Sequence, residues 1–217
     1  MKVKNIDTNV FNICIILMDD IQKYNNKIIH NFNYVFNKLN DSDQSRPIQV
    51  HYITYNTINI IDILKTYKDT YKYNAIILSG SSKRILQEGT PDLPKQIFRL
   101  KIPILGLCYG FQWMVKVLGG KVATFSDNTE HRYNKYIEFK KPFIVDKQKY
   151  FFYHYDYILE LPPHSSGWES IYENDNQIWI AENKRMGLLA LQFHPESHRK
   201  SAVAFYSAWI AWLKENM

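Results

Sequence analysis

The chain has 217 residues, 46% of them hydrophobic, which is enough for one domain with a buried core over residues 1–217. Two cysteines cannot form a disulfide framework, and no run of 18 apolar residues occurs, so a disulfide-rich secreted fold and a membrane span are excluded. Residues 1–7 hold no apolar signal core, and we expect a cytoplasmic protein.

The net charge of +6 raises the question of a nucleic-acid partner, but the lysines are spread along the chain and form no single basic block. We interpret them as a solvated surface and expect neither a nucleic-acid nor a membrane partner. The seven histidines are scattered, and neither a C-x-x-C nor an H-E-x-x-H pattern is present. We therefore expect no metal site and no cofactor.

The first half of the chain alternates short apolar runs with helical periodicity. Strands are predicted at residues 13–18, 48–54, 73–78 and 102–107, and helices near 29–39, 60–64, 91–100 and 111–118. Cys14 falls inside the first strand, where packing in the core explains it. The β-α-β-α order favours a parallel sheet that is covered by helices on both faces.

After Val122 the apolar residues alternate with polar ones, and Asn, Asp, Pro and Gly separate the segments. Antiparallel strands are predicted near 136–139, 151–153, 168–172 and 177–181, a buried strand at 188–193 and a last helix at 201–214. The predicted fold class is α/β: an open, mostly parallel sheet with helices on both faces and a small antiparallel β extension. Such sheets bind ligands at the carboxyl ends of their parallel strands.

The segment from Gly106 to Gly110 joins a predicted strand to a predicted helix, with Cys108 between them. Glycines on both sides permit the strained turn that holds a nucleophile clear of a sheet. The partial positive charge at a helix N-terminus favours a thiolate over a thiol. We therefore predict that Cys108 is an exposed, activated nucleophile, although a lone cysteine between glycines is also compatible with simple packing.

His194-Pro195-Glu196 supplies the base and the orienting group that a thiolate nucleophile needs. Pro195 favours extended geometry, in which side chains two residues apart lie on the same face. The sequence thus predicts a catalytic triad of Cys108, His194 and Glu196. Either motif alone is compatible with an inert core or loop position, but packing gives no reason for both together.

Together these motifs resemble the class I, triad-type glutamine amidotransferases over roughly the whole chain. The likeness rests on the pattern G-x-C-x-G-x-Q over residues 106–112 and on QFHPES over residues 192–197. It implies a flavodoxin-like core and hydrolysis of the glutamine side-chain amide through a γ-glutamyl thioester on Cys108.

The resemblance also implies an oxyanion hole. Its donors would be the backbone N–H groups of Tyr109, directly after the nucleophile, and of Ser81. The family has Gly-Gly-Pro at the second position, whereas this chain has Gly80-Ser81-Ser82. A serine costs free energy where a loop needs a positive φ, yet it keeps the N–H donor.

The substrate pocket is expected to involve Gln112, His154 and Tyr155. Gln112 lies one helical turn after the nucleophile. The segment Tyr153-His154-Tyr155-Asp156 resembles a Ser-His-Gly-Asp segment of GMP synthetase amidotransferase domains, and a His-x-Asp segment of γ-glutamyl peptidases. The two tyrosines replace smaller residues and would narrow the pocket. A solvated helix position and a plain surface turn are the alternative interpretations of these residues.

Three functions are compatible with these features. The first is a glutaminase, closest to the GMP synthetase type, that supplies ammonia to a synthetase. The chain holds no G-x-x-x-x-G-K-[ST] motif for nucleotide phosphates, so this synthetase would be a separate subunit that acts in trans. The alternative is a stand-alone γ-glutamyl hydrolase or peptidase. The third is a catalytically silent binding module on the same fold.

Overall fold

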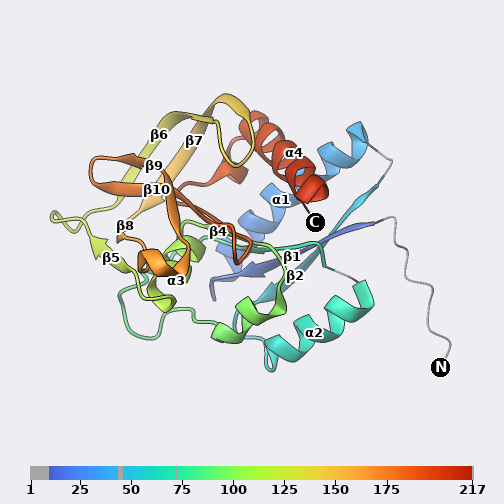
Figure 1. Ribbon diagram of the computed structural model, residues 1–217, viewed down its shortest axis with the longest axis horizontal. Helices are drawn as coiled ribbons and strands as arrows, with labels where there is room; N and C mark the ends of the chain where they lie inside the picture. The colour runs from blue at the N-terminus through green and yellow to red at the C-terminus, as the bar shows by residue number, and fades with distance from the viewer. Residues whose placement is uncertain (1–9, 44–45, 72, 217) are drawn as a thin grey trace.

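The computed structural model describes residues 10–43, 46–71 and 73–216. Residues 1–7, from which we expect no signal segment, lie outside this part. Its main sheet is mixed (Figure 1). Five parallel strands follow the order β2 (Ile48–Thr54), β1 (Phe11–Leu17), β3 (Ala75–Leu78), β4 (Ile104–Leu107) and β11 (Leu188–Leu191). Antiparallel strands continue it with β10 (Gln177–Asn183), β8 (Asp156–Glu160) and β5 (Lys121–Thr124), and β9 (Glu169–Asn174) also pairs with β10.

Helices cover both faces of the sheet, which confirms the predicted fold class. Helices α1 (Gln22–Ser42) and α4 (Arg199–Asn216) pack on one face. Helices α2 (Ile60–Tyr71) and α3 (Tyr109–Val117) and the 3-10 helix η1 (Lys95–Leu100) pack on the other. Strand β1 serves both layers because successive side chains alternate: Ile13 and Ile15 join the first core, and Cys14 and Ile16 the second.

A separate antiparallel hairpin, β6 (His131–Phe139) and β7 (Val145–His154), packs beside α4. Its aromatic side chains Phe139, Tyr150 and Phe152 pack with Phe193 and Phe205 in the core of that face. Strand β7 also reaches the end of the parallel sheet, since the N–H of residue 194 donates to the carbonyl of residue 151 over 2.8 Å. The hairpin is thereby fixed beside the carboxyl ends of the strands.

Some predicted elements differ from the structure. The predicted helix at 91–100 was wrong: only the 3-10 turn from Lys95 forms, because Pro94 is extended (φ −61°, ψ 126°) and has no N–H for a helix interior. Strands β5 and β8 were not predicted, and two further 3-10 turns are present, η2 (His164–Ser166) and η3 (Pro195–Ser197).

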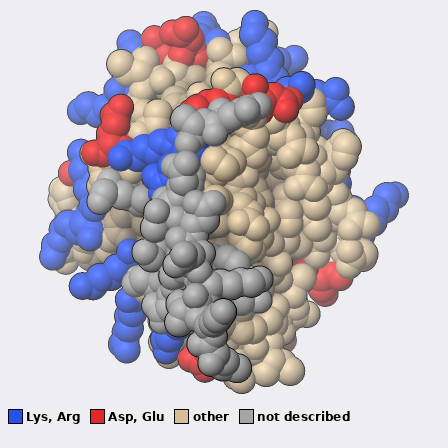
Figure 2. All heavy atoms as spheres, turned by 90° about the vertical axis from the view of Figure 1, so that its right-hand side faces the viewer, with Lys and Arg blue, Asp and Glu red and all other residues tan. Residues whose placement is uncertain are grey.

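The surface is mixed in charge on the face shown in Figure 2, where Lys and Arg lie around the rim and alternate with Asp and Glu. Within the described residues, no helix combines the length and hydropathy needed to cross a lipid bilayer.

Candidate active site

Cys108 occupies a strained turn between β4 and α3. Its φ of +47° and ψ of −99° lie outside the usual regions for a residue with a side chain. The turn is tight enough that a Cβ on Gly110 would lie 2.5 Å from the carbonyl oxygen of Leu78. The backbone N–H of Cys108 donates to the carbonyl of Leu191 over 2.7 Å, which fixes the turn to β11. The predicted elbow geometry is present.

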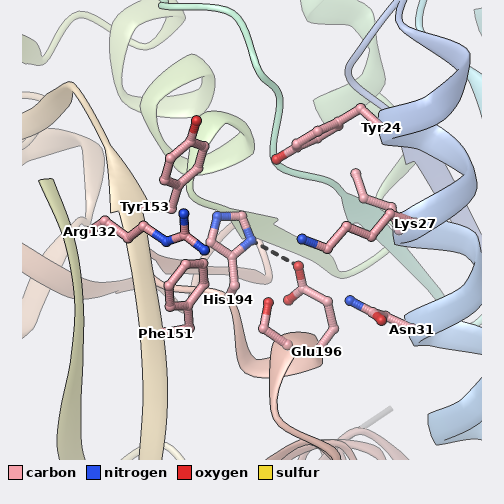
Figure 3. A pocket seen from close by; sticks show the side chains of 10 residues that line it. Tyr24, Lys27, Asn31, Arg132, Phe151, Tyr153, His194 and Glu196 are labelled. Carbon is pink, nitrogen blue, oxygen red and sulfur yellow. Dashed lines mark hydrogen bonds and ion pairs between the residues drawn. The ribbon is translucent and has the colours of Figure 1, made fainter. Parts of the chain in front are cut away.

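His194 and Glu196 form a buried pair, with Nδ1 of the imidazole 2.8 Å from Oε1 of the carboxylate (Figure 3). The prediction that they lie side by side is confirmed, but the predicted extended geometry is wrong. Glu196 belongs to the 3-10 turn η3, and Pro195 starts this turn because its fixed φ suits a first helical position.

The imidazole of His194 is tightly enclosed. A Cβ on Gly80 would lie only 2.6 Å from Cε1 of the ring, so a side chain at Gly80 would displace it. Burial alone lowers the pKa of His194, but the Glu196 carboxylate and the neighbouring Cys108 outweigh burial and raise that pKa above 6.5. The site therefore favours a positively charged imidazole beside Cys108.

The thiol of Cys108 is covered, and only 4% of the residue is exposed. It lies 3.5 Å from the carbonyl oxygen of Tyr153, to which it donates, and the side-chain amide of Gln192 donates to the sulfur over 3.6 Å. The prediction of an exposed thiol was therefore wrong. Cys14, the other cysteine, is fully buried in β1, where burial raises its pKa to about 12.

Asp19, which the motif analysis did not single out, holds the loop of the candidate oxyanion hole. Its Oδ2 accepts from the backbone N–H of Ser82 and from the hydroxyl of Ser81 at 3.1 Å, and its Oδ1 accepts from the N–H of Ile21 at 2.7 Å. Burial alone would raise the pKa of Asp19, but these hydrogen bonds lower it. A fixed negative charge thus anchors the Gly80–Ser82 loop.

The Ser81 backbone N–H donates to no acceptor among the described residues, whereas its side chain is occupied by Asp19. The neighbouring donor, the N–H of Tyr109, opens helix α3, and the Tyr109 hydroxyl donates to the carbonyl of Pro91 over 2.6 Å. The structure places both predicted oxyanion donors beside the nucleophile turn, where they and Cys108 line one cavity.

Gln112, His154 and Tyr155 line the same cavity. The Nε2 atom of Gln112 donates to the carbonyl of Asp156 over 2.6 Å, and Nδ1 of His154 lies 3.0 Å from the same oxygen. Burial lowers the pKa of His154 to about 4, so this ring is neutral at pH 7. These contacts fix the turn between β7 and β8 that forms one wall of the cavity.

The cavity beside Cys108 is small, with a volume of about 20 Å³. This is room for about one water molecule. Tyr155 and Arg84 both line it: Arg84 lies over the Tyr155 ring at 5.1 Å, and the Tyr155 hydroxyl donates to Glu130 over 3.2 Å. Arg84 is in turn held 3.3 Å from the buried carboxylate of Asp156. A glutamine side chain needs more room than this, so part of the cavity wall must move before one can bind.

The sequence is similar to known amidotransferases. A family model described as glutamine amidotransferase class-I matches residues 28–208. The GMP synthase (glutamine-hydrolyzing) of Brachyspira hyodysenteriae is 36% identical over 146 residues, which are 63% of this chain and 26% of that protein. That of Prochlorococcus marinus is 37% identical over 126 residues, 56% of this chain and 23% of that protein. The chain spans about a quarter of the length of these curated relatives.

Solved structures with the same fold cover nearly the whole chain. A putative GMP synthase subunit from Thermoplasma acidophilum has a TM-score of 0.67 at 17% identity, over 95% of this chain and 96% of that one. The glutaminase domain of Trypanosoma brucei CTPS has a TM-score of 0.65 at 14% identity, over 95% and 94%. Identities this low establish the fold alone.

Proposed function

Because the chain belongs to the class-I glutamine amidotransferase family, we propose that it hydrolyses the side-chain amide of glutamine to glutamate and ammonia through Cys108, His194 and Glu196. The observation that carries the proposal is the buried 2.8 Å contact between His194 and Glu196 beside a cysteine in a strained turn. A buried ion pair of this kind is costly to form, and simple packing gives no reason to keep it at this turn.

Cys108 attacks the amide carbon and forms a γ-glutamyl thioester. Before the attack the thiol proton already lies on Nε2 of the charged His194 ring, which passes it to the departing ammonia, while Glu196 accepts the hydrogen bond of the Nδ1 proton and stabilises the charged ring. Water then attacks the thioester with His194 as the base, and glutamate leaves. The negative oxygen of each tetrahedral intermediate is stabilised by the N–H groups of Ser81 and Tyr109.

The glutamine side chain occupies the cavity beside Cys108, against Gln112, His154 and Tyr155. Since this cavity has only about 20 Å³ of room, binding requires the cover formed by Tyr155 and Arg84 to move. We propose that a synthetase subunit docks in trans, opens this cover and receives the ammonia. The similarity to glutamine-hydrolysing GMP synthases supports a partner that aminates a nucleotide.

The test compares two cysteine variants of the same protein. Cys108→Ala should lower the rate of glutamine hydrolysis by several orders of magnitude, because removal of a triad nucleophile leaves only binding and oxyanion stabilisation. Cys14→Ala is the matched control: it removes the other thiol, which lies in the core, and should lower stability while turnover persists. Glutamate release in Cys108→Ala at the wild-type rate would refute the proposal.

A further inference from the structure

A second cavity opens between α1 and the β6–β7 hairpin. It has a volume of about 260 Å³, against about 20 Å³ for the cavity beside Cys108, and Tyr153 lines both. This volume lies just below the range of pockets for drug-sized ligands, which is about 300–1,000 Å³, and suits a small molecule. The proposed hydrolysis of glutamine assigns no role to this cavity.

One wall of the cavity is a polar stripe along α1. Tyr24, Lys27 and Asn31 line the cavity, and their spacing of three and four residues places them on one face of the helix. Ile28 lies on the same face and packs into the core. In Figure 3 the side chains of Lys27 and Asn31 extend from α1 into the cavity. Helix α1 therefore presents polar groups and one positive charge to this space.

The opposite wall supplies a second positive charge. Arg132 extends from β6, and its guanidinium lies over the ring of Phe151 at 5.6 Å from the ring centre, which orients it. Figure 3 shows Lys27 and Arg132 pointing into the cavity from opposite sides. Neither cation has a carboxylate within 4.0 Å among the described residues. Both charges are therefore available to a ligand.

The other groups that face the cavity leave these two charges unbalanced. Glu196 is the acidic residue in the wall, and its charge is balanced by the His194 imidazole, which it contacts at 2.8 Å. Tyr24 and Tyr153 also face the cavity, and burial raises the pKa of both phenols, so they stay neutral near pH 7. The cavity thus suits an anion that carries two negative charges.

A phosphate group meets this requirement better than a carboxylate does. At pH 7 a phosphate monoester carries a charge of about −1.5 to −2 and has three acceptor oxygens, whereas a carboxylate has one charge and two oxygens. Arginine binds phosphate oxygens in a bidentate manner, and lysine binds them as a point charge. The hydroxyl of Ser197 and the amide of Asn31, both in the wall, can donate to the remaining oxygens.

We propose that this cavity is a binding site for a small phosphate-bearing anion, which Lys27 and Arg132 hold from opposite sides. One water molecule needs about 10–15 Å³ of such a cavity, so 260 Å³ is more than the five heavy atoms of inorganic phosphate require. The space therefore favours a phosphate monoester with a small organic part over the free ion. The proposal is independent of the proposed reaction, since neither cation belongs to the triad or lines the cavity beside Cys108.

The test is titration calorimetry of the wild-type protein at pH 7 with glycerol 3-phosphate, inorganic phosphate and acetate, at one ionic strength set with sodium chloride. We expect one site per chain, with glycerol 3-phosphate bound most tightly and acetate bound at least about tenfold more weakly than either phosphate. Inorganic phosphate that binds as tightly as the ester would identify the free ion as the ligand of this site. Undetectable binding of both phosphates, or acetate bound as tightly as phosphate, would overturn the proposal.

Charge removal places the binding in this cavity. Lys27→Gln and Arg132→Gln should each weaken binding of glycerol 3-phosphate about tenfold, and the double variant should show none. Lys23→Gln on α1 and Lys135→Gln on β6 remove the same charge outside the cavity and should keep the wild-type affinity. All four side chains are exposed, so these substitutions should leave the fold intact.

Two results with these variants would refute the site. Binding that the double variant retains would place the anion elsewhere. An equal loss of affinity in the control variants would mean that the anion responds to the overall charge of the protein and not to this cavity. If a cavity variant fails to fold, the comparison of phosphate with acetate on the wild type decides.

Discussion

Gly80 provides a precise test of how closely the imidazole must be held. In Gly80→Ala the new Cβ would lie 2.6 Å from Cε1 of His194, and ordinary van der Waals contact needs about 3.4 Å or more. The ring must therefore retreat by roughly 0.8 Å, which strains its 2.8 Å contact with Glu196. A misplacement of about 1 Å near the reacting atoms can cost on the order of a hundredfold in rate.

We therefore expect kcat for glutamine hydrolysis to fall by about ten- to a hundredfold in Gly80→Ala, as measured by glutamate release at saturating glutamine. KM should change less, because neither Gly80 nor His194 lines the cavity beside Cys108 that we propose binds the glutamine side chain. Gly89→Ala is the matched control: Gly89 has a φ of +66° and nothing within 4 Å of a Cβ. It should lower the melting temperature and keep kcat.

Wild-type kcat in a folded Gly80→Ala protein would refute this reasoning, because it would mean that the ring can move without effect on the reaction. A loss of kcat in Gly89→Ala as large as that in Gly80→Ala would refute it as well, because stability alone would then explain both.

Two further predictions concern the loop and the cover. Asp19→Asn should lower kcat about tenfold, because an amide NH₂ would face the Ser82 N–H, and the lost charge-assisted contacts fix the oxyanion loop. Since the folded pKa of Asp19 is lowered, its contribution to stability is fully present above the unfolded pKa of about 3.9 and is lost as the pH falls from that value through the folded pKa. Denaturation at pH 7 and pH 3 should therefore show a stability difference between wild type and variant that shrinks in acid, and an unchanged difference would contradict this. Tyr155→Ala removes the contacts to Arg84 and Glu130 that we propose hold the cover in place, so KM for glutamine should fall several-fold, and a higher KM would mean that the contact of Tyr155 with the substrate outweighs its role as a cover.

Buried strands were the most predictable part of the fold. The run 48–54 became β2 over the same residues, and the runs that became β1, β3, β4 and β11 were each placed to within a few residues. Strands β1, β3, β4 and β11 are buried along their whole length, so their apolar residues form nearly continuous runs, whereas β2 is a half-buried edge strand in which apolar and polar residues alternate. Strand β5 was missed because it lies at the edge of the sheet, where its exposed and half-buried side chains leave no apolar run.

The strained turn at Cys108 and the pairing of His194 with Glu196 were predictable for a different reason, since each motif is local in sequence. Gly106, Gly110 and Pro195 constrain the backbone around the reactive side chains, and their effect can be read from neighbouring residues alone. Even so, the extended geometry predicted for His194 to Glu196 was wrong, because Pro195 is equally suited to open a 3-10 turn.

The supporting residues could not be predicted because tertiary contacts create them. Asp19 meets Ser81 across 62 positions in sequence, and Gln192 meets Cys108 across 84. One feature of the sequence could have pointed to Asp19. It follows a predicted buried strand almost directly, and ligands bind at the carboxyl ends of such strands. The burial of the thiol depends on the β7–β8 turn, whose position beside Cys108 also follows only from the fold.

Labelling with a glutamine analogue decides whether Cys108 is the nucleophile of a glutamine site. The wild-type protein is treated with a diazo-ketone or chloro-ketone analogue of glutamine, with and without excess glutamine, and the modified peptide is identified by mass spectrometry. We predict one label per chain on Cys108, protection by glutamine and no label on Cys14, whose burial raises its pKa to about 12. Labelling mainly on Cys14, or labelling of Cys108 that glutamine does not slow, would contradict this assignment.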